Sequence, residues 1–417
     1  MALTRWQWFI RLLTRRMWFR AALVSAFGGA LALAGALVGH SISYQFAATI
    51  GAKSVDGILT ILASSMLAVT TFSLTAMVSA YSGATSTITP RAVQLLIDDS
   101  TAQNTLATFL GSFLFAIVGI IALSTGLYGE TGRVILLVGT IAVILFIVVT
   151  LLRWIEHIAR FGRVSDTIDR VERAAMAAVD TIAVPLALGT EHTQPDARGM
   201  TPVMPRSMAR VTHVDVAVLG RLAQAIGADI HVLALPGKLV EPERPIALVA
   251  ASCDDTAVDK VRQAFTLSHH RTFDHDPRFG LVVLSEIASR ALSPAVNDPG
   301  TAIAVIEASA RVMLRLADHR TSEGTPLPAR VHVPPIRLAE LFDDWCRPIA
   351  RDGAAIVEVS IRLQKALAAL ARHAEPVRPL IKQEAFDAAE RSKAAMTSER
   401  DRVLVEETYQ SHFAEMD

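Results

Sequence analysis

Long apolar stretches without internal charge occupy the first 152 residues of the chain and do not recur later. They cover residues 21–38, 57–81, 105–127 and 134–152. Each is close to the roughly 20 residues that a helix needs to cross about 30 Å of hydrocarbon. The pattern therefore predicts four transmembrane helices followed by a large soluble half.

The segment before the first stretch has the pattern of an amphipathic helix. In residues 1–20 the apolar side chains share one helical face, and five arginines stand without an acidic residue. This pattern favours a helix that lies on an anionic membrane surface.

Arginine counts near the stretches predict the topology. Besides the five arginines at the N-terminus, Arg153, Arg160 and Arg163 follow the fourth stretch, whereas the connections after the first and third hold only Lys53 and Arg133. Because positively charged flanks stay on the cytoplasmic side, we expect both termini in the cytoplasm.

The second stretch carries a row of hydroxyl side chains. Thr60, Ser64, Thr71, Thr75 and Ser79 fall within about a 100° sector of a helix with 3.6 residues per turn. Such a row suits a wet pathway whose hydroxyls replace part of an ion's hydration. It also suits hydroxyls that bond to their own or a neighbouring helix. Both interpretations stay open, and in the first these five residues line a pore.

Two other features bear on what the spans do. No Asp, Glu, Lys or Arg lies deep within them, although charge-coupled transporters usually place such groups there. Gly28, Ala32 and Gly35 in the first stretch, with Gly111 and Gly119 in the third, predict close helix packing, either within the chain or between subunits. A passive pore in a homo-oligomer, or a plain anchor, is favoured over a pump.

Composition and periodicity divide the chain into regions. They are an interfacial helix at 1–20, a transmembrane domain at 21–152, a helix continuing from the fourth span at 153–184, a Pro- and Gly-rich linker at 185–205, an α+β unit at 206–255 and a helical domain at 256–417. The predicted fold class is an α-helical polytopic membrane protein with four transmembrane helices. Its cytoplasmic domain is mostly α-helical and contains a small α+β unit.

A polar cluster in the helical domain invites a chemical interpretation. Residues 269–276 hold three His and two Asp, but their spacing matches no template for zinc or manganese. We therefore predict no metal. The segment is interpreted as a polar turn in which Asp276 caps a helix that begins at Pro277.

The same arrangement recurs at Asp298 and Pro299, so two helices over 277–291 and 299–316 are expected to form a hairpin. Helix N-termini attract anions through free N–H groups, which makes a small anionic ligand a candidate partner. Otherwise the loop simply sets the geometry of the hairpin. The candidate ligand-binding residues are Arg271, Asp274, Asp276, Arg278, Ser293, Asn297, Asp298 and Thr301.

Two runs of residues resemble a known family. The run from Ala291 to Ala302, with Ser293-Pro294-Ala295-Val296-Asn297-Asp298-Pro299-Gly300-Thr301 at its centre, is similar to the hallmark of the bacterial membrane proteins called domain of unknown function 2254. The run from Arg271 to Gly280, Pro90-Arg91 and the strand at 213–215 also resemble family features. The resemblance implies a multi-pass protein of the bacterial inner membrane. It supplies no activity and no catalytic residues.

Several classes of function are disfavoured by composition. The net charge of +0 argues against nucleic acid as a partner. Cys253 and Cys346 form neither a zinc motif nor a disulfide framework. Because Walker, dinucleotide-binding, nucleophile-elbow and zincin motifs are missing, we expect no enzyme, no catalytic residues and no cofactor.

Two functions fit these patterns equally well. One is an oligomeric channel whose cytoplasmic half regulates or assembles it. The other is a membrane-anchored sensor or scaffold whose soluble domain binds a ligand or partner without permeation. In both, the lipid bilayer is a partner, and in the first a homo-oligomer forms.

Overall fold

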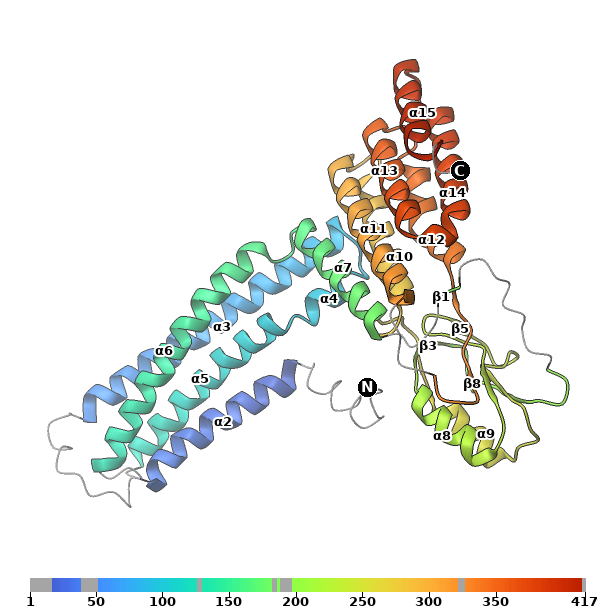
Figure 1. Ribbon diagram of the computed structural model, residues 1–417. Coiled ribbons are helices and arrows are strands. Elements are labelled where there is room, and N and C mark those ends of the chain that lie inside the picture. The colour runs from blue at the N-terminus through green and yellow to red at the C-terminus, as the bar shows by residue number, and fades with distance from the viewer. Residues whose placement is uncertain are drawn as a thin grey trace. The chain divides into compact units, whose positions relative to one another are not determined.

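The computed structural model describes residues 17–38, 52–125, 130–181, 186–187, 197–321 and 327–414. The chain forms two compact units (Figure 1). The membrane unit is built from residues 5–86 and 93–163. The C-terminal unit is built mainly from residues 164–417, together with the short connection at 87–92.

Helices make up the described part of the membrane unit. They are α2 (Met17–Val38), α3 (Ala52–Thr87), α4 (Val93–Ile97), α5 (Ser100–Ser124) and α6 (Glu130–Arg160). The interfacial helix predicted over residues 1–20 lies outside the described residues except at its last four positions, which belong to α2.

Among the described residues, three helical segments are long and apolar enough to cross a membrane. They are Val55–Thr85, Val93–Ser124 and Gly132–Arg160, and they cover the predicted second, third and fourth spans. The predicted first span is helical within α2, which has 22 residues. The described residues therefore contain three candidate membrane-spanning helices, and the count of four remains a prediction.

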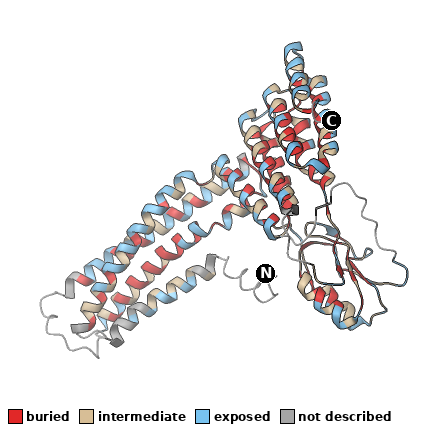
Figure 2. Cartoon of the chain, viewed as in Figure 1, coloured by how far each residue is buried: buried red, intermediate tan, exposed pale blue. Residues whose placement is uncertain are grey.

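The segment that contains α5 is the central helix of the membrane unit. In its most apolar window 56% of residues are buried, against 28% for the α3 segment and 17% for the α6 segment (Figure 2). Gly28 of α2 meets Gly111 of α5, where an added Cβ would lie 2.8 Å from the Gly111 carbonyl oxygen. Gly119 faces Leu59 and Leu136 in the same way. Small residues here allow helices of one chain to approach closely.

The membrane helices begin and end at recognisable signals. Asp99 caps α5 by accepting the Ala102 N–H at 2.8 Å. The predicted continuous helix over 153–184 is wrong. It is divided into α6 and α7 (Val164–Thr181) because Gly162 takes a left-handed conformation with φ 79°.

Short strands form the α+β part of the C-terminal unit. They are β1 (Leu186–Ala187), β2 (Thr201–Val203), β3 (Ala209–Val214), β4 (Ile230–Val232), β5 (Leu239–Val240), β6 (Ala247–Val249), β7 (Phe265–Ser268), β8 (Val331–His332) and β9 (Ile336–Arg337). Among the described residues the sheets have the orders β2-β6-β4-β8, β5-β3-β7 and β1-β9. Helices α8 (Val216–Ile226) and α9 (Asp255–Gln263) belong to the same region.

These pairings move the predicted domain boundaries. Strand β2 lies in the predicted linker and pairs with β6, while β7 lies in the predicted helical domain and pairs with β3. Strand β8 joins β4 from more than 90 residues away. The limits of 206 and 255 therefore cut through sheets, because short strands gain their stability from partners that are distant in sequence.

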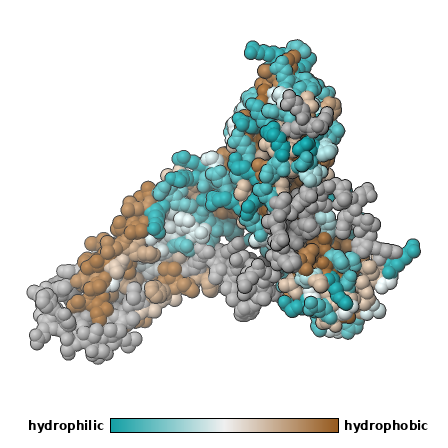
Figure 3. All heavy atoms as spheres, viewed as in Figure 1, coloured by the Kyte–Doolittle hydropathy of each residue, from teal (hydrophilic) through white to brown (hydrophobic). Residues whose placement is uncertain are grey.

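Helices form the remainder of the C-terminal unit. They are α10 (Pro277–Ala291), α11 (Pro299–Thr321), α12 (Leu338–Asp352), α13 (Val357–His373), the 3-10 helix η3 (Glu375–Val377), α14 (Arg378–Ala395) and α15 (Glu399–Phe413). Helix α10 has the predicted bounds. Helix α12 ends at a turn that begins with Gly353, and α13 follows it. On the face in Figure 3 hydrophilic residues cover much of this bundle, and apolar residues cover much of the membrane unit.

Candidate functional site

The hydroxyl row of the predicted second span lies on the exposed side of α3. Thr60, Ser64, Thr71, Thr75 and Ser79 are all exposed within the chain. The first four each donate a hydrogen bond of 2.9–3.0 Å to the backbone carbonyl four residues earlier. This is the self-bonding arrangement that the sequence left open, and it satisfies these hydroxyls without a neighbouring helix.

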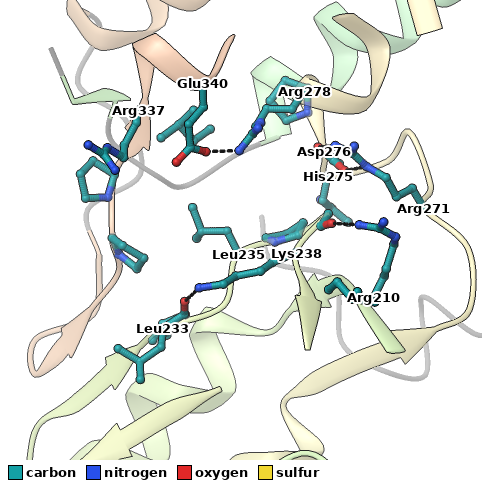
Figure 4. Close-up of a pocket in the computed structure, with 18 residues that line it drawn as sticks. Arg210, Leu233, Leu235, Lys238, Arg271, His275, Asp276, Arg278, Arg337 and Glu340 are labelled. Carbon is teal, nitrogen blue, oxygen red and sulfur yellow. Dashed lines mark hydrogen bonds and ion pairs between the residues drawn. The ribbon is translucent and has the colours of Figure 1, made fainter. Parts of the chain in front are cut away.

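The C-terminal unit contains a pocket of about 710 Å³ where the α+β part meets the helices (Figure 4). Its walls come from residues 232–239 around the turn between β4 and β5, from 275–278 at the start of α10, and from 334–340 around β9 and α12, with Arg210 and Arg271 beside them. Three separate parts of the chain therefore build one cavity.

Asp276 and Arg271 form an ion pair with two hydrogen bonds in the pocket wall. The Arg271 guanidinium donates to both Asp276 carboxylate oxygens at 2.8 and 3.0 Å, and it lies 5.1 Å from the centre of the Phe279 ring. Asp276 is only 4% exposed and also accepts the Phe279 N–H at 3.1 Å, which confirms the predicted helix cap. Burial raises the pKa of the Asp276 carboxyl, and the hydrogen bonds from Arg271 oppose the rise.

The turn beside this pair needs glycine. Gly237 has a φ of 90°, which favours residues without a Cβ, and a Cβ there would overlap the Asp276 carboxylate. The same residue's carbonyl accepts a 2.8 Å hydrogen bond from Arg210. Arg210 is thereby held next to the Arg271–Asp276 pair.

Arg278 joins α10 to α12 at the edge of the pocket. It donates to Asp344 at 2.7 and 3.3 Å and forms an ion pair with Glu340. Two carboxylates thus neutralise this cation, and its side chain fixes the starts of the two helices relative to each other.

Three further cations line the pocket without a carboxylate partner among the described residues. Arg210 and Lys238 donate to the carbonyls of Gly237 and Leu233, at 2.8 and 2.9 Å, and Arg337 is exposed at the end of β9. The lining contains five Arg and Lys side chains against two acids, Asp276 and Glu340. The pocket is therefore basic.

A histidine pair adjoins the basic wall. His275 lines the pocket, and its ring lies 4.5 Å from that of His213 on β3. Burial lowers the pKa of His213, while Asp215 and Asp274 oppose the shift. Burial therefore favours the neutral form of His213.

The predicted ligand residues do not form one site. Arg271, Asp276 and Arg278 line the pocket, and Asp274 stands beside it without lining it. The remaining four, Ser293, Asn297, Asp298 and Thr301, follow the far end of α10, a helix of 15 residues or about 22 Å.

That far loop has a structural role that its contacts explain. Asp298 accepts the Thr301 N–H at 3.1 Å and the Thr301 hydroxyl at 2.6 Å, as a helix cap does. Ser293 donates to the Arg290 carbonyl, and Asn297 takes a left-handed φ of 51° that Asn tolerates. Among the described residues no group of three His, Cys, Asp or Glu side chains is arranged for a metal ion.

Sequence patterns missed Arg210, Lys238, Arg337 and Glu340. They lie up to 130 positions apart, and none belongs to a recognisable motif. Only the basic character of the 271–278 segment signalled an anion site, and it did so for part of one wall.

Comparison with known proteins places the chain in a family. No curated protein and no solved structure matches it. A protein-family model described as predicted membrane protein (DUF2254) matches residues 14–369. This range covers most of the membrane unit, the pocket and the loop at 293–301, and it ends before α14 and α15. The chain therefore belongs to the family of domain of unknown function 2254, in agreement with the resemblance at residues 271–280 and 291–302.

Proposed function

We propose that this protein is a membrane-anchored sensor whose C-terminal unit binds a small anion in the basic pocket. The observation that carries the proposal is the excess of cations in the pocket lining, five against two acids. Arg210, Lys238 and Arg337 keep donors to spare, since Lys has three and Arg five. The function is binding, without catalysis.

Helix α12 adds to the attraction for an anion. It begins at Leu338, and the side chain of Arg337, its N-cap residue, makes no capping hydrogen bond. Its first-turn N–H groups and the positive end of its dipole lie next to Arg337 and Glu340 in the pocket lining. Helix α10, in contrast, is already capped by Asp276.

Helix α10 connects the pocket with residues 87–92 of the same unit. Arg278 lies in its first turn, and Glu286 follows two turns later. Glu286 accepts a 3.0 Å hydrogen bond from the Thr89 hydroxyl and forms an ion pair with Arg91. Residues 87–92 join α3 to the segment of α4 and α5. A ligand that shifts the start of α10 therefore acts on the connection between two spans.

The proposed setting is the bacterial inner membrane. Four spans with both termini in the cytoplasm agree with the arginine distribution, and they put residues 87–92 on the same side as Glu286. In this arrangement the sensor reports a cytoplasmic anion.

Titration of the full-length protein in lipid nanodiscs tests the proposal. Calorimetry in phosphate-free buffer with pyrophosphate, citrate and adenosine diphosphate should detect binding of at least one anion. The double variant Arg210→Gln/Lys238→Gln should lose it, whereas Arg244→Gln, an exposed residue outside the lining, should not. Binding that is equal in all three proteins would contradict the pocket as the site.

A second candidate is an oligomeric channel, and the observation that favours it is the exposed hydroxyl row of α3. Subunits that surround this row would place hydroxyls along a shared path. Liposomes that contain the protein should then pass small ions, and Ser64→Leu or Thr71→Leu should reduce the flux more than Ser64→Ala. Flux no greater than that of empty liposomes would leave the sensor without a pore.

A further inference from the structure

We infer that the anion is a phosphorylated organic molecule of nucleotide size, held with its phosphate on Arg210, Lys238 and Arg337 and its organic body on the proline-rich wall. This inference rests on the proposed function of the same pocket. It deepens that proposal by naming the chemical class of the ligand.

Charge sets the first limit on the ligand. Two of the five pocket cations are occupied, because Arg271 pairs with Asp276, and Arg278 with Asp344 and Glu340. The other three are not paired with a carboxylate among the described residues, and the five cations with Asp276, Glu340 and Asp344 keep about two positive charges. A phosphate monoester brings a charge of about −1.5 to −2 and three strong acceptor oxygens, whereas one carboxylate brings −1. Phosphate is therefore the better match.

Position supports phosphate as well. Arg210 of β3 and Lys238, the residue before β5, lie on neighbouring segments, since the Val211 N–H donates to the Lys238 carbonyl at 3.0 Å. Each side chain donates one hydrogen bond to a carbonyl and has further N–H donors. In Figure 4 Lys238 lies between Arg210 and Arg337 in the view, and all three line the same cavity.

Size sets the second limit. A cavity of about 710 Å³ lies within the range of roughly 300–1,000 Å³ that holds cofactor-sized molecules. A bare phosphate fills only a small part of it. The ligand therefore has an organic body.

The remaining lining fits such a body. Pro236, Pro277, Pro334 and Pro335 offer apolar surface and have no N–H to donate. Leu233 and Leu235 add further apolar surface to the lining. A flat or hydrophobic group packs against this surface without leaving a buried donor unpaired.

Four probes separate the parts of the ligand on the full-length protein in nanodiscs. Adenosine diphosphate carries both parts, pyrophosphate only the phosphates, adenosine only the body, and citrate an equal charge without phosphorus. We expect adenosine diphosphate to bind best, with pyrophosphate and citrate at least about tenfold weaker and adenosine undetectable at the same concentrations.

Variants locate the two parts. Lys238→Gln and Arg337→Gln should each lower the affinity for adenosine diphosphate about tenfold. This is the size expected for a lost charge-assisted hydrogen bond. Leu235→Asn should lower the affinity for adenosine diphosphate but leave the affinity for pyrophosphate unchanged. Lys260→Gln, on the exposed side of α9, is the matched control and should change neither. Unchanged melting temperatures without ligand show that the variants fold.

The outcomes distinguish this inference from the proposed function. Pyrophosphate or citrate binding as tightly as adenosine diphosphate would overturn the organic-phosphate class and leave an anion sensor. Adenosine diphosphate binding that survives in both charge variants would overturn the site assigned to the phosphate. Failure of every anion to bind would overturn both proposals.

Discussion

Polar side chains serve opposite purposes in the two units. On α3 the hydroxyls of Thr60, Ser64, Thr71 and Thr75 bond to their own helix, one turn back. In the C-terminal unit the charged side chains join separate elements: Arg311 of α11 holds Glu172 of α7 at 2.6 and 2.7 Å.

The difference follows from the surroundings. Apolar surroundings offer no water, so a hydroxyl in a spanning helix is most cheaply satisfied by the nearest carbonyl. In the C-terminal unit, paired carboxylates and guanidinium groups can be buried between helices and still be fully bonded. Removing a polar group should therefore cost little on α3 and much in the C-terminal unit.

The largest expected effect is at Asp276. Asp276→Ala removes the cap of α10 and leaves Arg271 unpaired in a site that is only 19% exposed for its side chain, so the free energy of unfolding should fall by about 3–5 kcal/mol. Denaturant titration of a full-length chain that keeps Trp345 as its only tryptophan, followed by fluorescence, measures it. Asp276→Asn keeps an acceptor for the Phe279 N–H and should lose less. A loss below about 1 kcal/mol would contradict the expectation that polar groups matter more for stability in the C-terminal unit than on α3.

Close packing rather than polar contacts should determine the stability of the membrane unit, and a substitution at Gly111 tests this. Any Cβ at Gly111 would overlap Val24, at 2.7 Å from its Cγ1 atom. Gly111→Val should therefore cost about 1–3 kcal/mol through overpacking, measured by loss of helical circular dichroism on titration with a denaturing detergent. Gly57→Ala, where the added Cβ meets nothing within 4 Å, is the control. Equal stability of both variants would contradict the close contact of α2 and α5.

An exposed cap should have an intermediate effect. Asp298→Ala should cost about 0.5–2 kcal/mol, and Asp298→Asn or Asp298→Ser should restore most of it. The hydrogen bonds from Thr301 lower the pKa of Asp298. Its contribution is therefore present above the ordinary carboxyl pKa and is lost as the pH falls through the lowered value. If Asn and Ser are as damaging as Ala, the charge itself has a role.

The smallest effect is expected on α3. Thr71→Val removes an exposed hydroxyl that serves only the Leu67 carbonyl, so stability should change by no more than about 0.5 kcal/mol. The same detergent titration checks it. A loss of more than 1 kcal/mol would show that this hydroxyl contacts another helix in the folded protein.

The sequence predicted those helix ends that depend on residues close to each other in the chain. Asp276 with Pro277 fixed the start of α10, because the cap and the first turn lie within three residues of each other. The break at Gly162 was missed, since helical periodicity continues on both sides of it and only the φ of 79° reveals it.

Distant pairings were beyond such reasoning. Strand β8 has two residues and exists because β4 lies beside it. The pocket likewise depends on the turn at Gly237, which brings Arg210 to Asp276. No periodicity in either segment indicates these contacts. The predicted residues therefore include Arg271, Asp276 and Arg278 of the pocket lining but not Arg210, Lys238, Arg337 or Glu340.

The bond between Thr89 and Glu286 also constrains how the protein is made. The two residues are 197 positions apart, and a chain grows by about 5–20 residues per second. Thr89 and Arg91 are therefore synthesised about 10–40 s before their partner exists. Throughout this interval the spans on either side of residues 87–92 insert without the contact, so the loop meets α10 only after the membrane helices are in place.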